Sequence, residues 1–526
     1  MATVWVMYII LSLIIGLIIV LAAIFFRYKR YYWKFLDVPH DHPRPLLSVL
    51  GAINRSGTYT EKERLDYYDT LYKRFKGTGP FCGYYNVLQP RVLVLDRDLV
   101  TQILIKDFSN FNDRGMYYNS KVDPLSADLY HLKGSSWKEM RIKLDPIYRK
   151  EQMSYLFTSV YEESHHLLTA FEEGLQNGVL NDFAQIKQII HRFVLTIIAK
   201  YVFGMVTNSH QDKSILDEFD AMTQLALTTQ RHGRFFNALL SRHRSTGRKL
   251  GCGVTNKKAE EYFLTLISEV VANREKFGTD AYDYMQLLIN LKTQEYSTHE
   301  TEDITNSKEL KEHLMKELAA HAFVFLRAGL NPIANTISYV LHELALNQWA
   351  QERVRKETQT ALQKNNEFNY ECVQAMKFMG QVISETLRLH PVTPYLVRRT
   401  LHNYIVPNNP RYVIQRDMYV IIPTHAMHND AEIYAEPHLF KPERFCGEEN
   451  RSREPGTWLG FGEGPRDCIG KHFAQLIVRI AIARLLTQYN FTLDLKKLIV
   501  ESQTGAGLSI RRISAPKDGQ EANVVI

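Results

Sequence analysis

The residues best suited to chemistry lie in one ten-residue segment, 461–470, which reads FGEGPRDCIG. Two glycines and a proline bend the backbone tightly just ahead of Cys468. An apolar helical pattern begins near Phe473, so the cysteine is expected in a loop that ends at a helix N-terminus. The helix dipole there favours a thiolate, which is a good ligand for a soft or borderline metal. The alternative for a single cysteine is a buried, inert thiol.

Two further groups of residues lie on predicted helices. Trp137 and Arg141 are four residues apart and therefore share one helix face. Glu385 and Arg388 are one helical turn apart, and Arg444 lies in a later loop-like segment. Taken alone, the first pair indicates ordinary packing and the second a surface ion pair worth a few tenths of a kcal/mol.

One helical pattern is much longer than the others. It runs from Leu310 to Leu346 with a single interruption, and about 37 residues would reach roughly 55 Å. Near its middle the sequence is AGLNPIANT, which places Pro332 inside the pattern. An interior proline typically costs ~3 kcal/mol, because it removes the hydrogen bond to the carbonyl four residues back, here that of Ala328.

The composition is that of a globular protein. Of the 526 residues, 45% are apolar and 23% are charged, and the formal net charge is +7. This modest charge suits an anionic membrane surface or an acidic partner as well as nucleic acid, so it selects no partner. Five widely spaced cysteines without a Cys-x-x-Cys pair argue against a disulfide framework or a zinc site. A reducing compartment is therefore expected for the catalytic part.

The N-terminus has the pattern of a membrane anchor. Residues 4–26 are apolar almost throughout, and a helix of that length spans the ~30 Å hydrocarbon core. Basic residues follow at 27–34, among aromatic residues, including Trp33, that suit the membrane interface. The alternatives are a cleaved signal peptide or a buried core helix, but no basic region precedes the apolar run. We expect an uncleaved anchor with a lumenal N-terminus and the remaining chain in the cytosol.

The segment 461–470 resembles the haem-ligand loop of the cytochrome P-450 family. The segment 136–146, SWKEMRIKLDP, looks like the arthropod microsomal, detoxification-type branch, as does REK at 274–276 followed by DYMQLL at 283–288. The resemblance extends from about Tyr32 to Ile513. It implies a mainly α-helical cytochrome P-450 fold, in which a helical haem domain with a small β-rich region lies behind an N-terminal transmembrane helix.

Three parts of the chain follow from this resemblance and from the anchor. Residues 1–30 are the transmembrane anchor with its basic stop-transfer segment. Residues 31–50 are a proline-rich hinge, and residues 51–526 are the haem-thiolate catalytic domain. The expected location is the endoplasmic reticulum membrane, with a single pass and a cytosolic catalytic domain.

The resemblance also implies how haem is held. Cys468 would be the axial ligand of the haem iron, with Phe461 packed beside the sulfur. Four residues would contact the haem propionates: Trp137, Arg141, Arg398 and Arg466. Electron donation from the thiolate toward iron favours O–O cleavage.

Two other sets of residues receive roles in the same way. A buried charged triad would brace the loop that carries Cys468, and its members are Glu385, Arg388 and Arg444. Two arginines around one carboxylate in bidentate geometry make a rigid support. A groove in the long helix would receive oxygen, and its residues are Ala328, Gly329 and Asn331.

The sequence departs from the family where oxygen is activated. The family usually has an acid and then a threonine where this chain has Asn331 and Pro332. Asn331 can form hydrogen bonds but cannot supply a proton, and Pro332 has neither a hydroxyl nor a backbone N–H. Because helices of this family already open near the Ala-Gly step, we predict a kinked but intact helix. Thr336, four residues on, is one turn too far to substitute.

Three functions remain open at this stage. The first is a membrane-bound monooxygenase that inserts one oxygen atom from O2 into hydrophobic small molecules such as xenobiotics, fatty acids, steroids or terpenoids, with water or a substrate hydroxyl relaying protons. Its cofactors would be haem and, through a reductase, NADPH. Its partners would be NADPH-cytochrome P-450 reductase, cytochrome b5 as a second candidate, and membrane lipid, with no nucleic acid. The alternatives are an isomerase or dehydratase that acts on hydroperoxides without NADPH, and a low-turnover haem or ligand-binding protein.

Overall fold

The computed structural model describes residues 13–17, 31–42, 61–86, 89–149, 152–178, 183–205, 213–229, 243–278, 281–297, 308–493 and 508–512, and a few single or paired residues up to 240. The chain forms two compact units. The first comprises Met1–Gly115, Pro394–Met427 and Pro455–Thr457, and the second comprises Met116–Thr393, His428–Glu454 and Trp458–Ile526.

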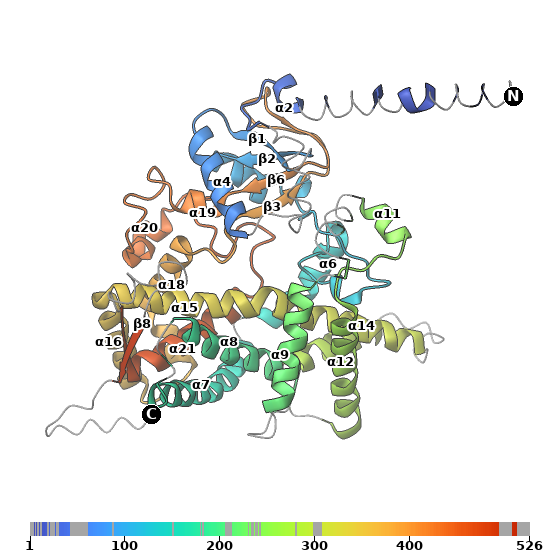
Figure 1. The fold of residues 1–526 in the computed structure, drawn as a ribbon. Coiled ribbons are helices and arrows are strands. Elements are labelled where there is room, and N and C mark those ends of the chain that lie inside the picture. The colour runs from blue at the N-terminus through green and yellow to red at the C-terminus, as the bar shows by residue number, and fades with distance from the viewer. Residues whose placement is uncertain are drawn as a thin grey trace, which may run out of the picture. The chain divides into compact units, whose positions relative to one another are not determined.

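The first unit is built on a four-stranded sheet in the order β1-β2-β6-β3 (Figure 1). The strands are β1 (Phe81–Asn86), β2 (Gln89–Val94), β6 (Tyr419–Ile422) and β3 (Leu396–Arg399). β2 pairs in parallel with β6, while β1 with β2 and β3 with β6 are antiparallel. A two-stranded sheet of β4 (Tyr404–Ile405) and β5 (Val413–Ile414) accompanies them. The other elements of this unit are α2 (Tyr32–Phe35), α4 (Glu61–Phe75), α5 (Arg97–Thr101), η1 (Gln102–Lys106), η2 (Phe108–Asn110) and most of α19 (Thr424–His428).

The start of the expected hinge is folded onto this sheet. Trp33 on α2 is fully buried, and it lies so close to Gly83 that a Cβ there would be 2.3 Å from the indole. The Gly83 N–H donates to the carbonyl of Pro39 at 2.8 Å. Trp33 is therefore a core residue, and the expectation that it lies at the membrane interface was wrong.

The second unit is mainly helical. Its helices before the long pattern are α6 (Gly134–Leu144), α7 (Met153–Gln176), α8 (Phe183–Ile197), α9 (Lys213–Thr228), α11 (Arg244–Lys249), α12 (Lys257–Phe277) and α13 (Tyr284–Ser297). After it come α16 (Gln348–Asn365), α17 (Tyr370–Ala375), α18 (Lys377–Leu389), α20 (Gly447–Arg451) and α21 (Lys471–Gln488). Short turns lie between them: η3 (Pro124–Ser126), η4 (Asp145–Tyr148), η6 (Ile198–Val202) and η9 (Pro442–Phe445). β7 (Tyr489–Leu493) and β8 (Leu508–Arg512) form its antiparallel pair.

The long helical pattern is present as predicted, with one irregular turn. α14 (Lys308–Phe325) continues through a π-helical turn, η8 (Leu326–Leu330), into α15 (Asn331–Leu346). The three elements follow one line through the second unit (Figure 1), and α8 packs against α15. Most side chains of α15 are buried, which fits a central helix that is apolar on nearly every side.

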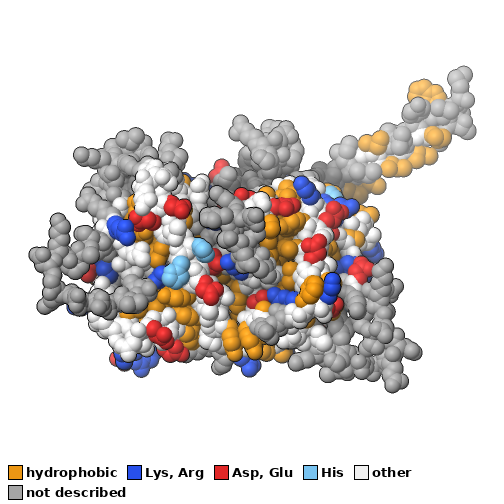
Figure 2. All heavy atoms as spheres, turned by 90° about the horizontal axis from the view of Figure 1, so that it is seen from below, with side chains coloured by type: hydrophobic (Ala, Val, Ile, Leu, Met, Phe, Trp, Pro, Cys, Tyr) orange, Lys and Arg blue, Asp and Glu red, His pale blue; other side chains and the backbone are white. Residues whose placement is uncertain are grey.

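α8 shows how a helix can serve the core and a polar surface together. Its buried residues recur with helical spacing at Ile186, Ile190, Phe193 and Ile197. Polar residues one step round the helix remain accessible, and these face the cavity described below. On the face drawn in Figure 2, acidic and basic side chains of the described residues are interspersed with apolar ones.

Among the described residues, no helix has the length and apolar character required to span a membrane. Most of the predicted anchor at 1–30 falls outside those residues, as does the hinge after residue 42.

Candidate functional site

Cys468 lies in a tight loop just before α21. The loop needs positive φ at two glycines, Gly462 at 71° and Gly464 at 77°, where side chains would strain the backbone. The Cys468 N–H donates to the carbonyl of Phe461 at 2.8 Å and closes the loop. Gly470 precedes the first residue of α21, and the first turn of that helix contains no acidic residue. Cys468 is exposed, so the structure presents the thiol beside a helix N-terminus, as the sequence indicated.

A cluster of aromatic rings links the cysteine loop to the long helix. Phe473 on α21 contacts Phe325 at the end of α14, with 5.1 Å between ring centroids. Tyr148 stacks on Phe325 at 5.7 Å, and its hydroxyl lies 3.2 Å from that of Tyr284. Burial raises the pKa of Tyr148 well above its usual value, and the neighbouring Tyr284 and Cys468 add to the effect. Tyr148 therefore remains a neutral phenol close to Cys468.

Arg466 fastens the cysteine loop to the segment before α6. Its Nη2 donates to the carbonyls of Tyr130 at 3.2 Å and Leu132 at 2.5 Å. Its guanidinium lies over the Trp137 ring at 4.9 Å. Two predicted propionate ligands, Trp137 and Arg466, are therefore in direct contact.

Arg141 is also bound to the cysteine loop. It donates to the Asp467 carbonyl at 2.9 Å and to its carboxylate at 2.8 Å. Trp137 is buried on the same helix, whereas Arg141 is partly accessible, with 19% of its side chain exposed. The structure thus brings Trp137, Arg141 and Arg466 together beside Cys468, and their contact with propionates stays a prediction.

The predicted charged triad is assembled. Arg388 makes a bidentate pair with Glu385, at 2.7 Å from Nε and 2.8 Å from Nη2, and both side chains are fully buried. Arg444 approaches the same carboxylate at 3.3 Å. The Lys441 N–H adds a hydrogen bond of 2.9 Å, so the buried charge has several donors.

His428 connects this triad to the cysteine loop. Arg388 Nη1 donates to the His428 carbonyl at 2.7 Å. The His428 Nε2 accepts from the Leu459 N–H at 2.9 Å, so the ring proton is on Nδ1, which faces the Arg388 carbonyl at 3.2 Å. Leu459 is two residues before Phe461, and the triad therefore supports the start of the loop through one imidazole.

Arg398 lies in the other unit, on β3, with 2% of its surface exposed. Its Nη1 donates to the carbonyl of Val397 at 3.0 Å. The adjacent Arg399 is engaged separately, at 2.8 Å from the Asp417 carboxylate. Arg398 is therefore a buried cation whose partners differ from those of Arg399. Its contact with a propionate stays a prediction.

The predicted oxygen groove coincides with the π-helical turn. Ala328 is exposed although Leu326 and Leu330 on either side are buried. A Cβ added at Gly329 would meet nothing closer than 3.9 Å. There is consequently open space beside this turn. Asn331 begins α15 beyond the turn, and it lines a polar cavity on the side of α8 and α9.

A buried charged cluster next to this turn was missed at the sequence level. Arg327 Nε lies 3.5 Å from the Asp128 carboxylate, and its Nη1 lies 3.3 Å from Nε2 of His131. His131 Nδ1 contacts the other Asp128 oxygen at 2.9 Å. The only signal in the sequence was Arg327 itself, since it is the single Asp, Glu, Lys or Arg between residues 319 and 342.

The three side chains of this cluster fix one another's protonation. Burial alone would raise the pKa of the Asp128 carboxyl, but His131 and Arg327 hold it below its usual range. Burial lowers the pKa of His131, and the charge of Arg327 acts in the same direction against Asp128. A neutral His131 with its proton on Nδ1 donates to Asp128 and accepts from Arg327.

The residues present fit a haem. The donor set offers an accessible thiol for iron, and arginine and indole N–H groups suited to carboxylates. The exposed Ala328 provides space in the middle of an otherwise buried helix. Within the described residues no cluster of three or more His, Cys, Asp or Glu side chains could hold a metal ion by itself.

Comparison with known proteins agrees with this site. The family profile described as Cytochrome P450 matches residues 42–514. The chain is 45% identical over 523 residues to the probable cytochrome P450 317a1 of Drosophila melanogaster, which covers 99% of this chain and 100% of the relative. It is 36% identical over 516 residues to cytochrome P450 6a9 of the same fly, covering 95% and 99%. It is 34% identical over 482 residues to cytochrome P450 6A1 of Musca domestica, covering 91% of each.

A helical domain with an exposed cysteine before a helix and matches of this length define a haem-thiolate protein. The chain belongs to the cytochrome P450 family and is a monooxygenase of that family. The relatives named above are insect proteins, in agreement with the branch that the sequence resembled. Family membership implies a haem cofactor and an electron-transfer partner.

Proposed function

We propose that the protein inserts one oxygen atom from O2 into apolar small molecules, using electrons from NADPH that a reductase delivers. Xenobiotics, fatty acids, steroids and terpenoids are the candidate substrate classes. The observation that carries the proposal is the exposed thiol of Cys468 at the start of α21, joined through Phe473 and Phe325 to the turn at Ala328.

The protein's own residues have distinct tasks in this function. Bound haem supplies oxygen activation, which a thiolate ligand promotes by donating electron density. Cys468 would hold the iron, while Trp137, Arg141 and Arg466 would hold the propionates. Glu385 and Arg388 keep the loop in place through His428.

We also propose the setting in which this happens. The N-terminal pattern supports an anchor in the endoplasmic reticulum membrane with the catalytic units in the cytosol. NADPH-cytochrome P-450 reductase is the proposed electron donor, and cytochrome b5 is a second. Lys471 and His472 follow the cysteine loop and could meet an acidic donor.

A second function rests on a specific observation, the pair Asn331-Pro332. Pro332 has no N–H or hydroxyl, and the Thr336 hydroxyl donates its hydrogen bond to the Pro332 carbonyl at 2.7 Å. Rearrangement or dehydration of a hydroperoxide needs a haem-thiolate but neither a proton relay nor NADPH. This is the alternative function that an experiment must separate.

The test is turnover of purified protein, reconstituted with reductase, on an apolar substrate panel with and without NADPH. Oxygenated product that requires NADPH is the expected result, and hydrogen peroxide release is followed alongside. Product from hydroperoxides without NADPH would instead support the rearrangement function. Intact haem with no product in either arm would favour a binding protein and contradict the proposal.

A further inference from the structure

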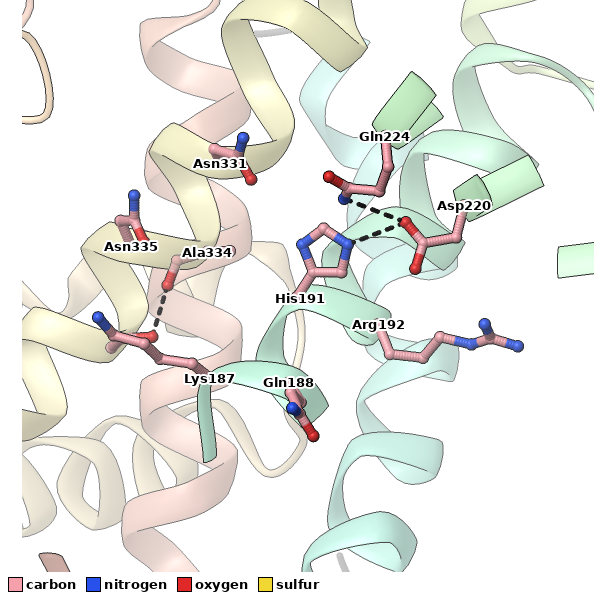
Figure 3. Close-up of a pocket in the computed structure, with 10 residues that line it drawn as sticks. Lys187, Gln188, His191, Arg192, Asp220, Gln224, Asn331, Ala334 and Asn335 are labelled. Carbon is pink, nitrogen blue, oxygen red and sulfur yellow. Dashed lines mark hydrogen bonds and ion pairs between the residues drawn. The ribbon is translucent and has the colours of Figure 1, made fainter. Parts of the chain in front are cut away.

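A polar cavity of about 400 Å³ lies on the side of α15 that faces α8 and α9 (Figure 3). At about 30 Å³ per molecule, it has room for on the order of ten waters. Nine of its ten lining residues carry polar groups, which can hydrogen-bond to water in the cavity. The lining residues are Lys187, Gln188, His191, Arg192, Asp220, Gln224, Asn331, Ala334, Asn335 and Ser338.

The cavity reaches the long helix at the residue where an acid is missing. Asn331 lines it and directly precedes Pro332 and follows the π-helical turn. No Asp or Glu occurs on the long helix between residues 319 and 342. Glu343, the next carboxylate, is engaged with His390 at 2.7 Å. The helix itself therefore offers no acid near the turn.

Across the cavity from Asn331 lies a histidine–carboxylate pair. His191 Nε2 lies 3.2 Å from the Asp220 carboxylate, which also accepts from Gln224 at 3.3 Å (Figure 3). The side chains of His191 and Asp220 are 23% and 29% exposed, so water can reach both. The hydrogen bond from His191 lowers the pKa of Asp220, which keeps this carboxyl ionised near neutrality.

The other charged groups around His191 are accounted for. On α8, Lys187 lies over the rings of Phe183 and Tyr339, and Arg192 is paired with Asp217 of α9. Burial lowers the pKa of Lys187. From α15 only amide and hydroxyl side chains and Ala334 reach the cavity. Asp220 is thus the one carboxylate that lines it, and its partner is the His191 imidazole, a side chain that can donate or accept a proton.

We propose that this cavity is the water route by which protons enter the oxygen-activating helix, with His191 as the exchanging group, Asp220 as its positioning partner and Asn331 as the amide that orders water next to the turn. The proposal rests on the proposed function, whose reaction consumes two protons and two reductase electrons for each O2. Each proton that leaves the His191 ring is replaced from bulk water, and no other bond forms or breaks in the cavity. The acid absent from the helix is in this way replaced by a pair on its neighbours.

The test compares His191→Gln and Asp220→Asn with a matched control, Asp217→Asn. Asp217 is also on α9 and pairs with α8, but it does not line the cavity. We expect His191→Gln to raise peroxide released per product roughly tenfold and to remove the pH dependence of coupling, because a general acid is lost. The control should retain wild-type coupling and its pH profile. A purely structural ion pair would change stability without changing that profile.

Two further arms keep the proposal falsifiable. In an Asn331→Glu background, which restores an acid to the helix, His191→Gln should no longer affect coupling. Independently of turnover, the pH dependence of diethyl pyrocarbonate labelling of His191, read by mass spectrometry, should shift to lower pH in Asp220→Asn and not in Asp217→Asn. If His191 is not labelled, or if its labelling profile is the same in Asp220→Asn as in the wild type, the proposal is overturned even where product forms. If His191 is labelled with a profile that depends on Asp220 but no NADPH-dependent product forms, the proposed function is overturned. The proton route is then overturned with it.

Discussion

Arg327 Nη1 lies 3.3 Å from Nε2 of His131, so a cation and an imidazole meet one residue before the exposed Ala328. Asp128, fully buried, closes the cluster. The main chain that carries His131 is held from its other side by Arg466 of the cysteine loop. The cluster therefore joins the long helix to the loop that carries the thiol.

Removing the arginine of this cluster should be costly. Arg327→Leu leaves the Asp128 carboxylate buried without its cation, and we expect a loss of about 3–5 kcal/mol in the free energy of unfolding. The double variant Asp128→Asn/Arg327→Leu buries no charge and should recover most of that loss. Guanidinium chloride unfolding of both proteins checks this, and equal losses would contradict it.

The same cluster predicts a pH dependence of stability. Because burial and Arg327 lower the pKa of His131 in the folded protein, this side chain takes up a proton more readily in the unfolded chain than in the folded protein. Stability should therefore fall as pH drops through about 6.5, the unfolded value, by up to about 1.4 kcal/mol per pH unit. His131→Gln should flatten the dependence of the melting temperature between pH 7.5 and 5.5. His438→Gln, at an exposed position, is the control and should leave the slope unchanged.

The triad under the loop permits a comparison of buried and exposed ion pairs. Glu385→Ala leaves Arg388 fully buried without its carboxylate. It should lower the free energy of unfolding by about 3–5 kcal/mol and also reduce the haem content. The control is Glu443→Ala, because Arg353 and Glu443 are 53% and 49% exposed and such pairs contribute at most about 1 kcal/mol. Unfolding midpoints and haem per protein are the measurements. A Glu385 variant as stable as the Glu443 variant would show that the triad gives no support.

The sequence predicted those features of the fold and of the site that depend on interactions between residues close together in the chain. The loop before α21 and the long helix were predictable, because glycine, proline and helical periodicity act over a few residues. Trp33 was misplaced, since its neighbour Gly83 is far along the chain and an aromatic residue suits a core as well as a membrane interface. The cluster of Asp128, His131 and Arg327 gave no pattern, because Arg327 is distant in sequence from the other two.

The identity of the thiol can be tested against a second exposed cysteine in the same unit. Cys468→Ser should remove the thiolate-iron spectrum and lower haem retention, because a serine hydroxyl is a poor ligand by comparison. Cys446 is also exposed and is remote from the loop sequence, so Cys446→Ser should keep both properties. The measurement is the absorption spectrum of the reduced, carbon monoxide-bound protein. An unchanged spectrum in Cys468→Ser would exclude this cysteine as the ligand.

Pro332 should be far less disruptive than an interior helix proline. It is the second residue of α15, which restarts after the π-helical turn at Leu330, and the first N–H groups of a helix lack partners within it. We therefore expect Pro332→Ala to change the free energy of unfolding by less than about 1 kcal/mol, and not to recover the ~3 kcal/mol of an interior proline. The comparison is Ala334→Pro. Ala334 lies within α15 and is buried, so this substitution should cost about 3 kcal/mol or more. If Pro332→Ala stabilised the protein by as much as Ala334→Pro destabilised it, the π-helical turn would not be what accommodates the proline.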